Sequence, residues 1–160
     1  MAFAGSFFLF NLYINLSASL PRGVYRAVDG DLQRGSYVLF CPPRSAVFDE
    51  ARQRGYIGAG FCDGSYGYMM KKILAAKSDR VSVSDDGMRV NGELVPNSQP
   101  LACDLSGRLL PRYRTGEFVL AEGELMLGGI TAKSFDSRYF GPIHSTQVRS
   151  VLEPIFVFRR

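Results

Sequence analysis

The stretch YMMKKILAAKSDRVSVSDDGMRVNGELV, residues 68–95, has the pattern of consecutive antiparallel strands. Asp85-Asp86-Gly87 marks one turn, and Asn91-Gly92 marks a second, tighter one. Asn-Gly between two short apolar runs is a strong signal for a β-hairpin. Strands are therefore expected at residues 68–76, 80–84, 88–90 and 93–95. The stretch predicts a β-rich fold that includes a hairpin.

The flanking sequence extends this pattern and adds few helices. An apolar strand at residues 36–40 is ended by Pro42-Pro43, and Ser45 is placed to cap a short helix that finishes before Gly55. A loop-rich stretch, residues 96–115, precedes the last strands. Those strands are expected near residues 117–121 and 155–158. The prediction is a mainly β fold with few short helices.

The domain organisation follows from length and from the absence of internal divisions. A chain of 160 residues suits one domain, and no repeat, low-complexity tract or long linker divides it. We expect a catalytic domain at residues 15–160, with residues 79–116 as a hairpin and loop insertion.

Charge and cysteine content limit the classes of partner and cofactor. The net charge of +4 is spread along the chain, which weakly favours anionic membrane headgroups or acidic partners. No nucleic-acid-binding motif is present, so no nucleic acid is expected as a partner. The single histidine, His144, and three cysteines without CxxC spacing make a metal site improbable. No glycine-rich phosphate loop is present either, so the sequence predicts no cofactor.

The three cysteines leave two interpretations open. In an oxidising compartment Cys41 and Cys62 are the favoured pair, because they flank one short segment that contains the expected helix. Cys103 would then stay free. Alternatively, all three are small buried apolar side chains.

Residues 1–14 are mostly apolar, yet too short to cross a bilayer, which takes about 20 residues. No lysine or arginine precedes Arg22, so the charged start of a secretion signal is missing. We interpret this segment as the remnant of a membrane anchor or an interfacial segment. The alternative is a first buried strand or helix of the core.

Two serine-containing motifs and a lysine pair suggest the chemistry. The motifs are NLSASLPRGVY, residues 15–25, and SFDSRYFGPI, residues 134–143, with Lys71-Lys72 between them. Strand alternation puts Lys71 on one face with Met69 and Ile73, where burial would lower the pKa of its amine. A neutral amine of this kind can take the proton of a serine hydroxyl. The alternative is that both lysines reach water at the ends of their apolar stems.

In combination, these motifs resemble the type I signal peptidase superfamily, most closely its conjugative-transfer branch, the TraF-type pilin maturation peptidases. The resemblance runs from about residue 15 to about residue 155, and it implies a signal-peptidase-like β-fold and roles by position. Ser19, before Leu20-Pro21, is the implied nucleophile, and Lys71, first of the lysine pair, is the implied general base. Ser17 and the Ser19 amide are the implied oxyanion hole.

The second motif supplies the implied supporting residues. Ser134 matches the serine that orients the lysine amine, while Asp136 and Arg138 match a pair that supports its loop. Without the resemblance, Ser134 would read as a cap and the pair as a surface ion pair. Gly128-Gly129-Ile130 stands where general signal peptidases carry Gly-Asp-Asn, which favours the conjugative branch.

The resemblance implies a membrane-associated serine endopeptidase on the periplasmic face of a bacterial inner membrane. Its implied substrate is a pilin-like precursor of the conjugative, type IV secretion machinery, cleaved or cyclised through an acyl-enzyme. Two alternatives remain: a general leader peptidase, and a non-catalytic β-rich module of a conjugation or secretion complex.

Overall fold

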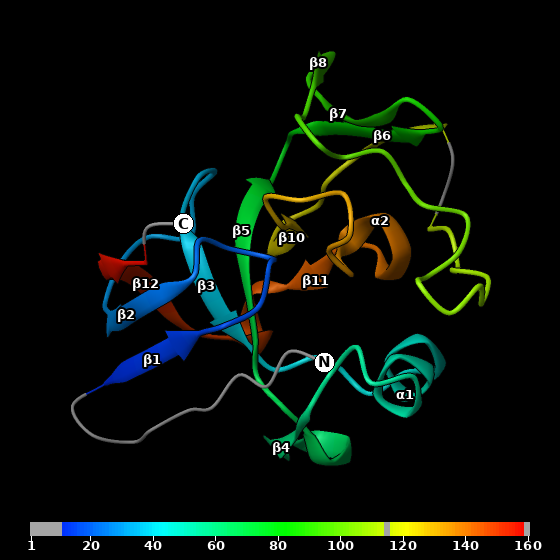
Figure 1. Ribbon diagram of the computed structural model, residues 1–160. Helices are drawn as coiled ribbons and strands as arrows, with labels where there is room; N and C mark the ends of the chain where they lie inside the picture. The colour runs from blue at the N-terminus through cyan, green and yellow to red at the C-terminus, as the bar shows by residue number, and fades with distance from the viewer. Residues whose placement is uncertain (1–10, 114–115, 159–160) are drawn as a thin grey trace.

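The computed structural model describes residues 11–113 and 116–158 (Figure 1). Strand is the commonest regular structure in this part of the chain, which also has two short α-helices. The strands are β1 (Leu12–Asn15), β2 (Gly23–Val28), β3 (Tyr37–Phe40), β4 (Ala59–Cys62), β5 (Met69–Ala75), β6 (Arg80–Ser84), β7 (Gly87–Val90), β8 (Glu93–Leu94), β9 (Gly116–Val119), β10 (Glu124–Gly128), β11 (Ile143–His144) and β12 (Val148–Val157). The helices are α1 (Ala46–Gln53) and α2 (Ser137–Phe140), with single 3-10 turns η1 (Asp63–Ser65) and η2 (Ser145–Gln147). The predicted mainly β class is confirmed.

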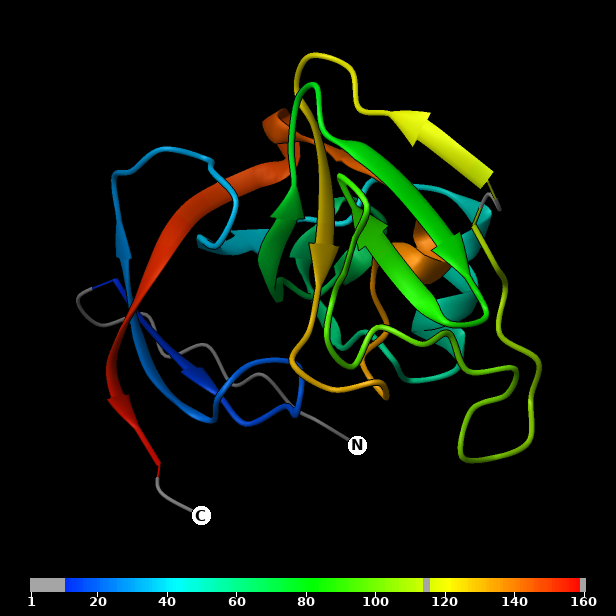
Figure 2. The same ribbon diagram turned by 90° about the horizontal axis from the view of Figure 1, so that it is seen from above.

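The larger sheet has seven strands in the order β1-β2-β12-β3-β5-β10-β11, and all neighbours in it are antiparallel. Its long strand β12 pairs with β2 on one side and β3 on the other. In Figure 2 this strand, in orange to red, sweeps along one side of the molecule. Pro154 lies in β12 beside a shift of register against β2, as expected of a proline within a sheet.

Strand β5 lies in this sheet between β3 and β10. Its side chains contribute to the apolar clusters on both sides, with Ile73 fully buried in one and Met70 in another. Lys71 lies on the same face as Ile73 and is buried, while Lys72 on the other face is only half-buried.

The smaller sheet has four strands in the order β8-β7-β6-β9. The predicted hairpin is confirmed: β6 pairs with β7, and Asn91-Gly92 forms the turn into β8. Val81, Val83 and Met88 of this sheet pack with Met126 of β10, so the two sheets share apolar contacts. The division of the chain at residues 15 and 79–116 stays a prediction.

Gly23 marks a close approach of two strands. It begins strand β2 opposite the end of β12. A Cβ atom there would lie 2.1 Å from the carbonyl oxygen of Phe156. The close approach of two backbones requires glycine at this position.

Cys41 and Cys62 form a disulfide with a Cα–Cα distance of 5.5 Å, and Cys103 is free. The favoured pairing is confirmed. The disulfide joins the end of β3 to β4 and encloses α1. Ser45 occupies the N-cap of α1 as expected, although its side chain makes no capping hydrogen bond.

The predicted anchor segment falls mostly on residues 1–10, which lie outside the described residues. Its last part, from Leu12 onward, belongs to β1 and pairs with β2, so that Ile14 faces Val24. In residues 11–113 and 116–158, no helix is long and apolar enough to cross a bilayer.

Candidate active site

The fold brings three predicted site residues from distant parts of the chain into contact. Lys71 projects from β5, Ser19 lies in the loop after β1, and Ser134 precedes α2. The Lys71 amine lies 2.7 Å from Ser19 Oγ and 2.8 Å from Ser134 Oγ. The two hydroxyl oxygens are 3.4 Å apart. An amine, a half-buried hydroxyl and a second hydroxyl thus form one hydrogen-bonded group.

The environment of Lys71 shifts its acid–base behaviour in the direction that the sequence predicted. Its side chain is 3% exposed, and burial lowers the pKa of Lys71 to about 8 from an ordinary 10.5. The carboxylate of Asp136 opposes this shift, and the guanidinium of Arg138 adds to it. Lys72 lies on the other face of β5 and is only half-buried. The strand therefore separates one dry lysine from one that reaches water.

Neighbouring apolar contacts hold the Ser19 loop against the sheet. Leu20 is 1% exposed and packs in a cluster with Tyr25 and Met70. The Tyr25 hydroxyl also donates to the carbonyl of Pro21 at 2.6 Å. Ser19 is half-buried while its neighbour is anchored in the core. This leaves the Ser19 hydroxyl accessible from one side and restrained from the other.

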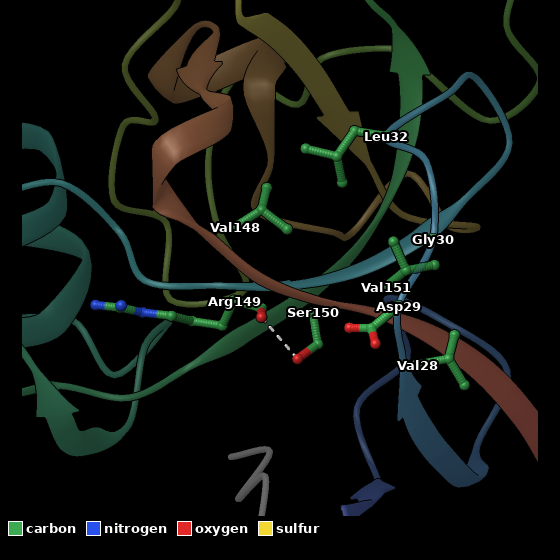
Figure 3. A pocket seen from close by; sticks show the side chains of 8 residues that line it. All are labelled: Val28, Asp29, Gly30, Leu32, Val148, Arg149, Ser150 and Val151. Atoms are coloured by element: carbon green, nitrogen blue, oxygen red, sulfur yellow. Dashed lines mark hydrogen bonds between the residues drawn. The ribbon is translucent and has the colours of Figure 1, made fainter.

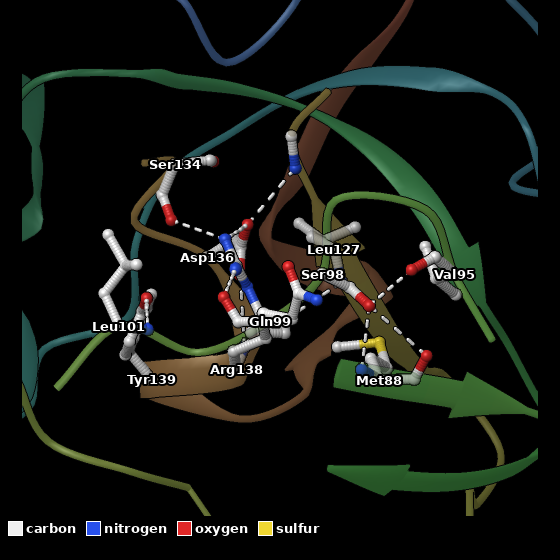
Figure 4. Close-up of polar contacts among 12 residues, drawn as sticks. Met88, Val95, Ser98, Gln99, Leu101, Leu127, Ser134, Asp136, Arg138 and Tyr139 are labelled. Carbon is white, nitrogen blue, oxygen red and sulfur yellow. Dashed lines mark hydrogen bonds and ion pairs between the residues drawn. The ribbon is translucent and has the colours of Figure 1, made fainter. Parts of the chain in front are cut away.

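The segment after Ser134 is built around a buried ion pair (Figure 4). Asp136 caps α2 and accepts two side-chain hydrogen bonds from Arg138, at 2.7 and 2.8 Å. Both side chains are 2% exposed. Arg138 also donates to the Ser134 carbonyl at 2.8 Å and to the Gln99 carbonyl at 2.7 Å. The pair thus fixes the backbone of Ser134 and ties it to the loop between β8 and β9 of the smaller sheet.

Ser17 and Ser19 lie close together, as the oxyanion-hole prediction requires. The Ser19 amide donates to Ser17 Oγ at 3.3 Å. The Ser17 hydroxyl itself donates to Asn15 Oδ1 at 2.8 Å. An oxygen atom placed beside both donors would share the Ser19 amide hydrogen with Ser17 Oγ, and it would bind the Ser17 hydroxyl after that O–H bond rotates away from Asn15.

Two further residues contact the site through their backbones, and sequence reasoning did not assign them a place there. The Ile130 amide donates to the Ser19 carbonyl at 2.7 Å, and the Gly129 amide donates to Asp136 Oδ2 at 3.2 Å. A Cβ on Gly129 would lie 2.4 Å from Ser134 Oγ. The glycine pair before Ile130 was the available signal, but only the fold shows that it leaves room for Ser134.

Asn15 is a third residue that the sequence did not single out. It is 1% exposed at the end of β1, and its side chain hydrogen-bonds within the loop that carries Ser17 and Ser19.

Other parts of the described structure offer less chemistry. A surface hollow of about 320 Å³ (Figure 3) is lined by Val28, Asp29, Gly30, Leu32, Val148, Arg149, Ser150 and Val151, and it includes no predicted site residue. Among residues 11–113 and 116–158, no three His, Cys, Asp or Glu side chains gather closely enough to hold a metal ion. The Ser19, Lys71 and Ser134 group is the arrangement best suited to catalysis. It pairs a candidate nucleophile with a base whose pKa is lowered.

Comparison with known proteins places this chain in a family. The family model described as signal peptidase, peptidase S26, matches residues 1–156. A crystal structure of a signal peptidase I from Enterococcus faecalis V583 is 18% identical, covers 78% of this chain and 98% of that one, and gives a TM-score of 0.43.

Relatives with higher sequence identity are named for plasmid transfer or conjugal transfer. A plasmid transfer protein TraF of Escherichia coli is 51% identical over 91% of this chain and 82% of its own length. A second E. coli protein of that name is 44% identical over 97% and 88%. A conjugal transfer protein TraF of Agrobacterium fabrum is 35% identical over 91% and 82%. The chain belongs to the signal peptidase family, peptidase S26, as a homologue of these TraF proteins.

Proposed function

We propose that this protein is a serine endopeptidase in which Ser19 is the nucleophile and Lys71 is the general base. The observation that carries the proposal is the 2.7 Å contact between the Lys71 amine and Ser19 Oγ in a water-excluding environment. Family membership supports the reaction class, since signal peptidases cleave peptide bonds. The dyad itself is our assignment.

The first step needs Lys71 in its neutral form. A neutral amine has a lone pair that can accept the Ser19 proton as the oxygen attacks the scissile carbonyl carbon. Ser134 Oγ lies 2.8 Å from the same nitrogen and can accept a hydrogen bond from one of its N–H groups. This contact leaves the lone pair directed at Ser19. The Asp136–Arg138 pair acts one step further away, because it holds the Ser134 backbone.

The tetrahedral intermediate places negative charge on the former carbonyl oxygen. The Ser19 amide and the Ser17 hydroxyl are the proposed donors to that oxygen. Collapse of the intermediate breaks the peptide bond, and protonated Lys71 gives its proton to the leaving amine. An acyl-enzyme remains on Ser19. Lys71 then activates either water, which yields a carboxylate, or the amino terminus of the substrate, which yields a cyclic product.

The proposed substrate is a pilin-like precursor of a conjugative apparatus, processed at the periplasmic face of the inner membrane. The support is the similarity to proteins named for plasmid and conjugal transfer, together with the signal peptidase family match. In this proposal the type IV secretion machinery and the membrane are the protein's partners.

Mass spectrometry of a candidate pilin precursor tests this proposal. The precursor is incubated with the wild type, Ser19→Ala and Lys71→Met, with Lys72→Met as the matched control. We expect cleavage by the wild type and by Lys72→Met only. A product that lacks the mass of one water relative to the cleaved chain would identify cyclisation. Cleavage that persists in Ser19→Ala would overturn the assignment of the nucleophile.

A further inference from the structure

Asn15 occupies an unusual position for a polar side chain without a charge. It ends β1 opposite Gly23 of β2, so the two residues close the loop that contains Ser17 and Ser19. Its side chain is 1% exposed. Burial of a primary amide is costly unless its donors and acceptor are all used. The hydrogen bonds of Asn15 therefore indicate what the side chain does.

The side-chain oxygen of Asn15 accepts two hydrogen bonds, both from Ser17. It accepts from the Ser17 amide at 3.1 Å and from Ser17 Oγ at 2.8 Å. An amide oxygen can only accept, so the hydroxyl proton of Ser17 must lie on the Asn15 side. Together these bonds fix both the backbone and the hydroxyl oxygen of Ser17.

The side-chain nitrogen of Asn15 donates hydrogen bonds mainly to residues that follow Ser19. It donates to the carbonyls of Leu20 at 3.0 Å and Pro21 at 3.2 Å, with a longer contact of 3.3 Å to the Ser17 carbonyl. One side chain thus links the residues before and after Ser19. Without it, the carbonyls of Ser17 and Leu20 would need other partners, whereas the Pro21 carbonyl would keep the Tyr25 hydroxyl.

This arrangement controls the spacing of the two proposed oxyanion donors. Ser17 Oγ lies 3.3 Å from the Ser19 nitrogen because Asn15 holds the hydroxyl on one side and the loop backbone on the other. A donor whose oxygen atom is already in place needs only to rotate its O–H bond as charge develops, which is a smaller reorganisation than moving the whole side chain. When the oxyanion forms, the Ser17 proton has to turn from Asn15 to the new acceptor, while its oxygen is already in place.

We propose that Asn15 is the positioning residue of the oxyanion hole, acting on the substrate through Ser17. The inference rests on the proposed function, since the hole has a role only if Ser19 is acylated. A purely structural asparagine would stabilise the loop without a specific effect through Ser17. The two interpretations differ in how Asn15 and Ser17 substitutions combine.

The test is a double-mutant cycle on cleavage of the pilin precursor, with kcat and KM measured separately. Asn15→Ala is made in the wild type and in Ser17→Ala. Asn91→Ala is the matched control, because it removes an amide that bridges Arg80 and Asp79 in the small sheet. All rates are measured well below the Tm of each variant, so that loss of stability does not reduce the amount of folded protein.

We expect Asn15→Ala to lower kcat by about tenfold or more with KM changed by less than about twofold. In the Ser17→Ala background the same substitution should lower kcat by less than about threefold, since its main target is already gone. Asn91→Ala should lower the Tm and leave kcat unchanged. Asn15→Ser, which keeps a small polar side chain, provides the same cycle if Asn15→Ala does not fold.

Each other outcome is decisive. An equal loss of kcat in both backgrounds, or an unchanged kcat in Asn15→Ala, would overturn the positioning role while the peptidase assignment stands. Absence of Ser19-dependent cleavage by the wild type would overturn the proposed function and this inference together.

Discussion

The two sheets of this protein differ in whether their polar side chains are buried or exposed to solvent. Among the described residues, the buried polar and charged side chains other than Ser98 lie at the site on the larger sheet or in helix α2 beside it: Asn15, Lys71, Ser134, Asp136, Ser137 and Arg138. On the smaller sheet the charged groups lie at the surface, as in the Arg80–Glu117 pair, whose side chains are 65% and 58% exposed.

The difference shows which part of the fold contains groups whose burial lowers the free energy of unfolding. Surface pairs such as Arg80–Glu117 are worth at most about 1 kcal/mol and cost little to form. Buried ionisable groups lose hydration, and an apolar replacement is often neutral or stabilising. A domain that collects these groups in one place is best explained by chemistry at that place. The following predictions test this contrast.

Removal of the buried amine should have the largest effect. Lys71→Met keeps the length of the side chain but has no base, so cleavage of the precursor should fall by at least about a thousandfold. Lys72→Met, its neighbour on the other face of β5, should keep activity within about twofold of the wild type. Equal losses in the two variants would mean that burial does not distinguish the lysines.

Disruption of the buried ion pair should be the next largest effect. Arg138→Met leaves the Asp136 carboxylate buried without its partner, which typically costs about 3–5 kcal/mol. Arg80→Met breaks the exposed pair on the smaller sheet and should cost less than about 1 kcal/mol. Denaturant unfolding of both variants measures the difference. Similar midpoints would contradict the contrast between the sheets.

Lys71→Met should also stabilise the fold in a pH-dependent way. Because burial lowers the pKa of Lys71 to about 8 from 10.5, the folded protein loses this proton before the unfolded chain does. Below pH 8 the charged buried amine costs about 3 kcal/mol relative to an ordinary lysine. This cost diminishes as the pH rises from 8 to 10.5. Unfolding curves should therefore show a gain in Lys71→Met that is full below pH 8 and shrinks above it.

The same shifted pKa predicts the dependence of the reaction on pH. Only neutral Lys71 can accept the Ser19 proton, so kcat/KM should reach half of its plateau near pH 8. At pH 6 it should be about a hundredfold below the plateau, because each unit below the pKa lowers the neutral fraction about tenfold. A rate that stays constant between pH 6 and pH 9 would exclude an amine of this pKa as the base.

The smaller sheet was the easier to predict. Its hairpin is formed by neighbours in sequence, and Asn91-Gly92 specifies the turn locally. Strands β2, β4, β10 and β11 were missed, and β12 was predicted only at its end. β10 pairs with distant β5, and β2 pairs with distant β12 as well as with neighbouring β1. Pro154 also interrupts the strand signal of β12.

For the site, motif order predicted a group of Ser19, Lys71 and Ser134, because each lies in a recognisable local pattern, and the structure places the three within hydrogen-bonding distance. Asn15 and Gly129 lie in or beside the motifs, but the sequence does not indicate what either residue does. Asn15 acts by filling a loop with hydrogen bonds, and Gly129 acts by leaving space beside Ser134. Both properties exist only once the backbone is folded.

The most direct test of the Ser19–Lys71 dyad is intact-mass and peptide mapping after treatment with a serine-acylating inhibitor. It needs no knowledge of the substrate. We predict one adduct, on Ser19, in the wild type and in Lys72→Met, and none in Ser19→Ala or Lys71→Met. Labelling of Lys71→Met at the wild-type rate, or an adduct on a residue other than Ser19, would contradict the assignment of the dyad.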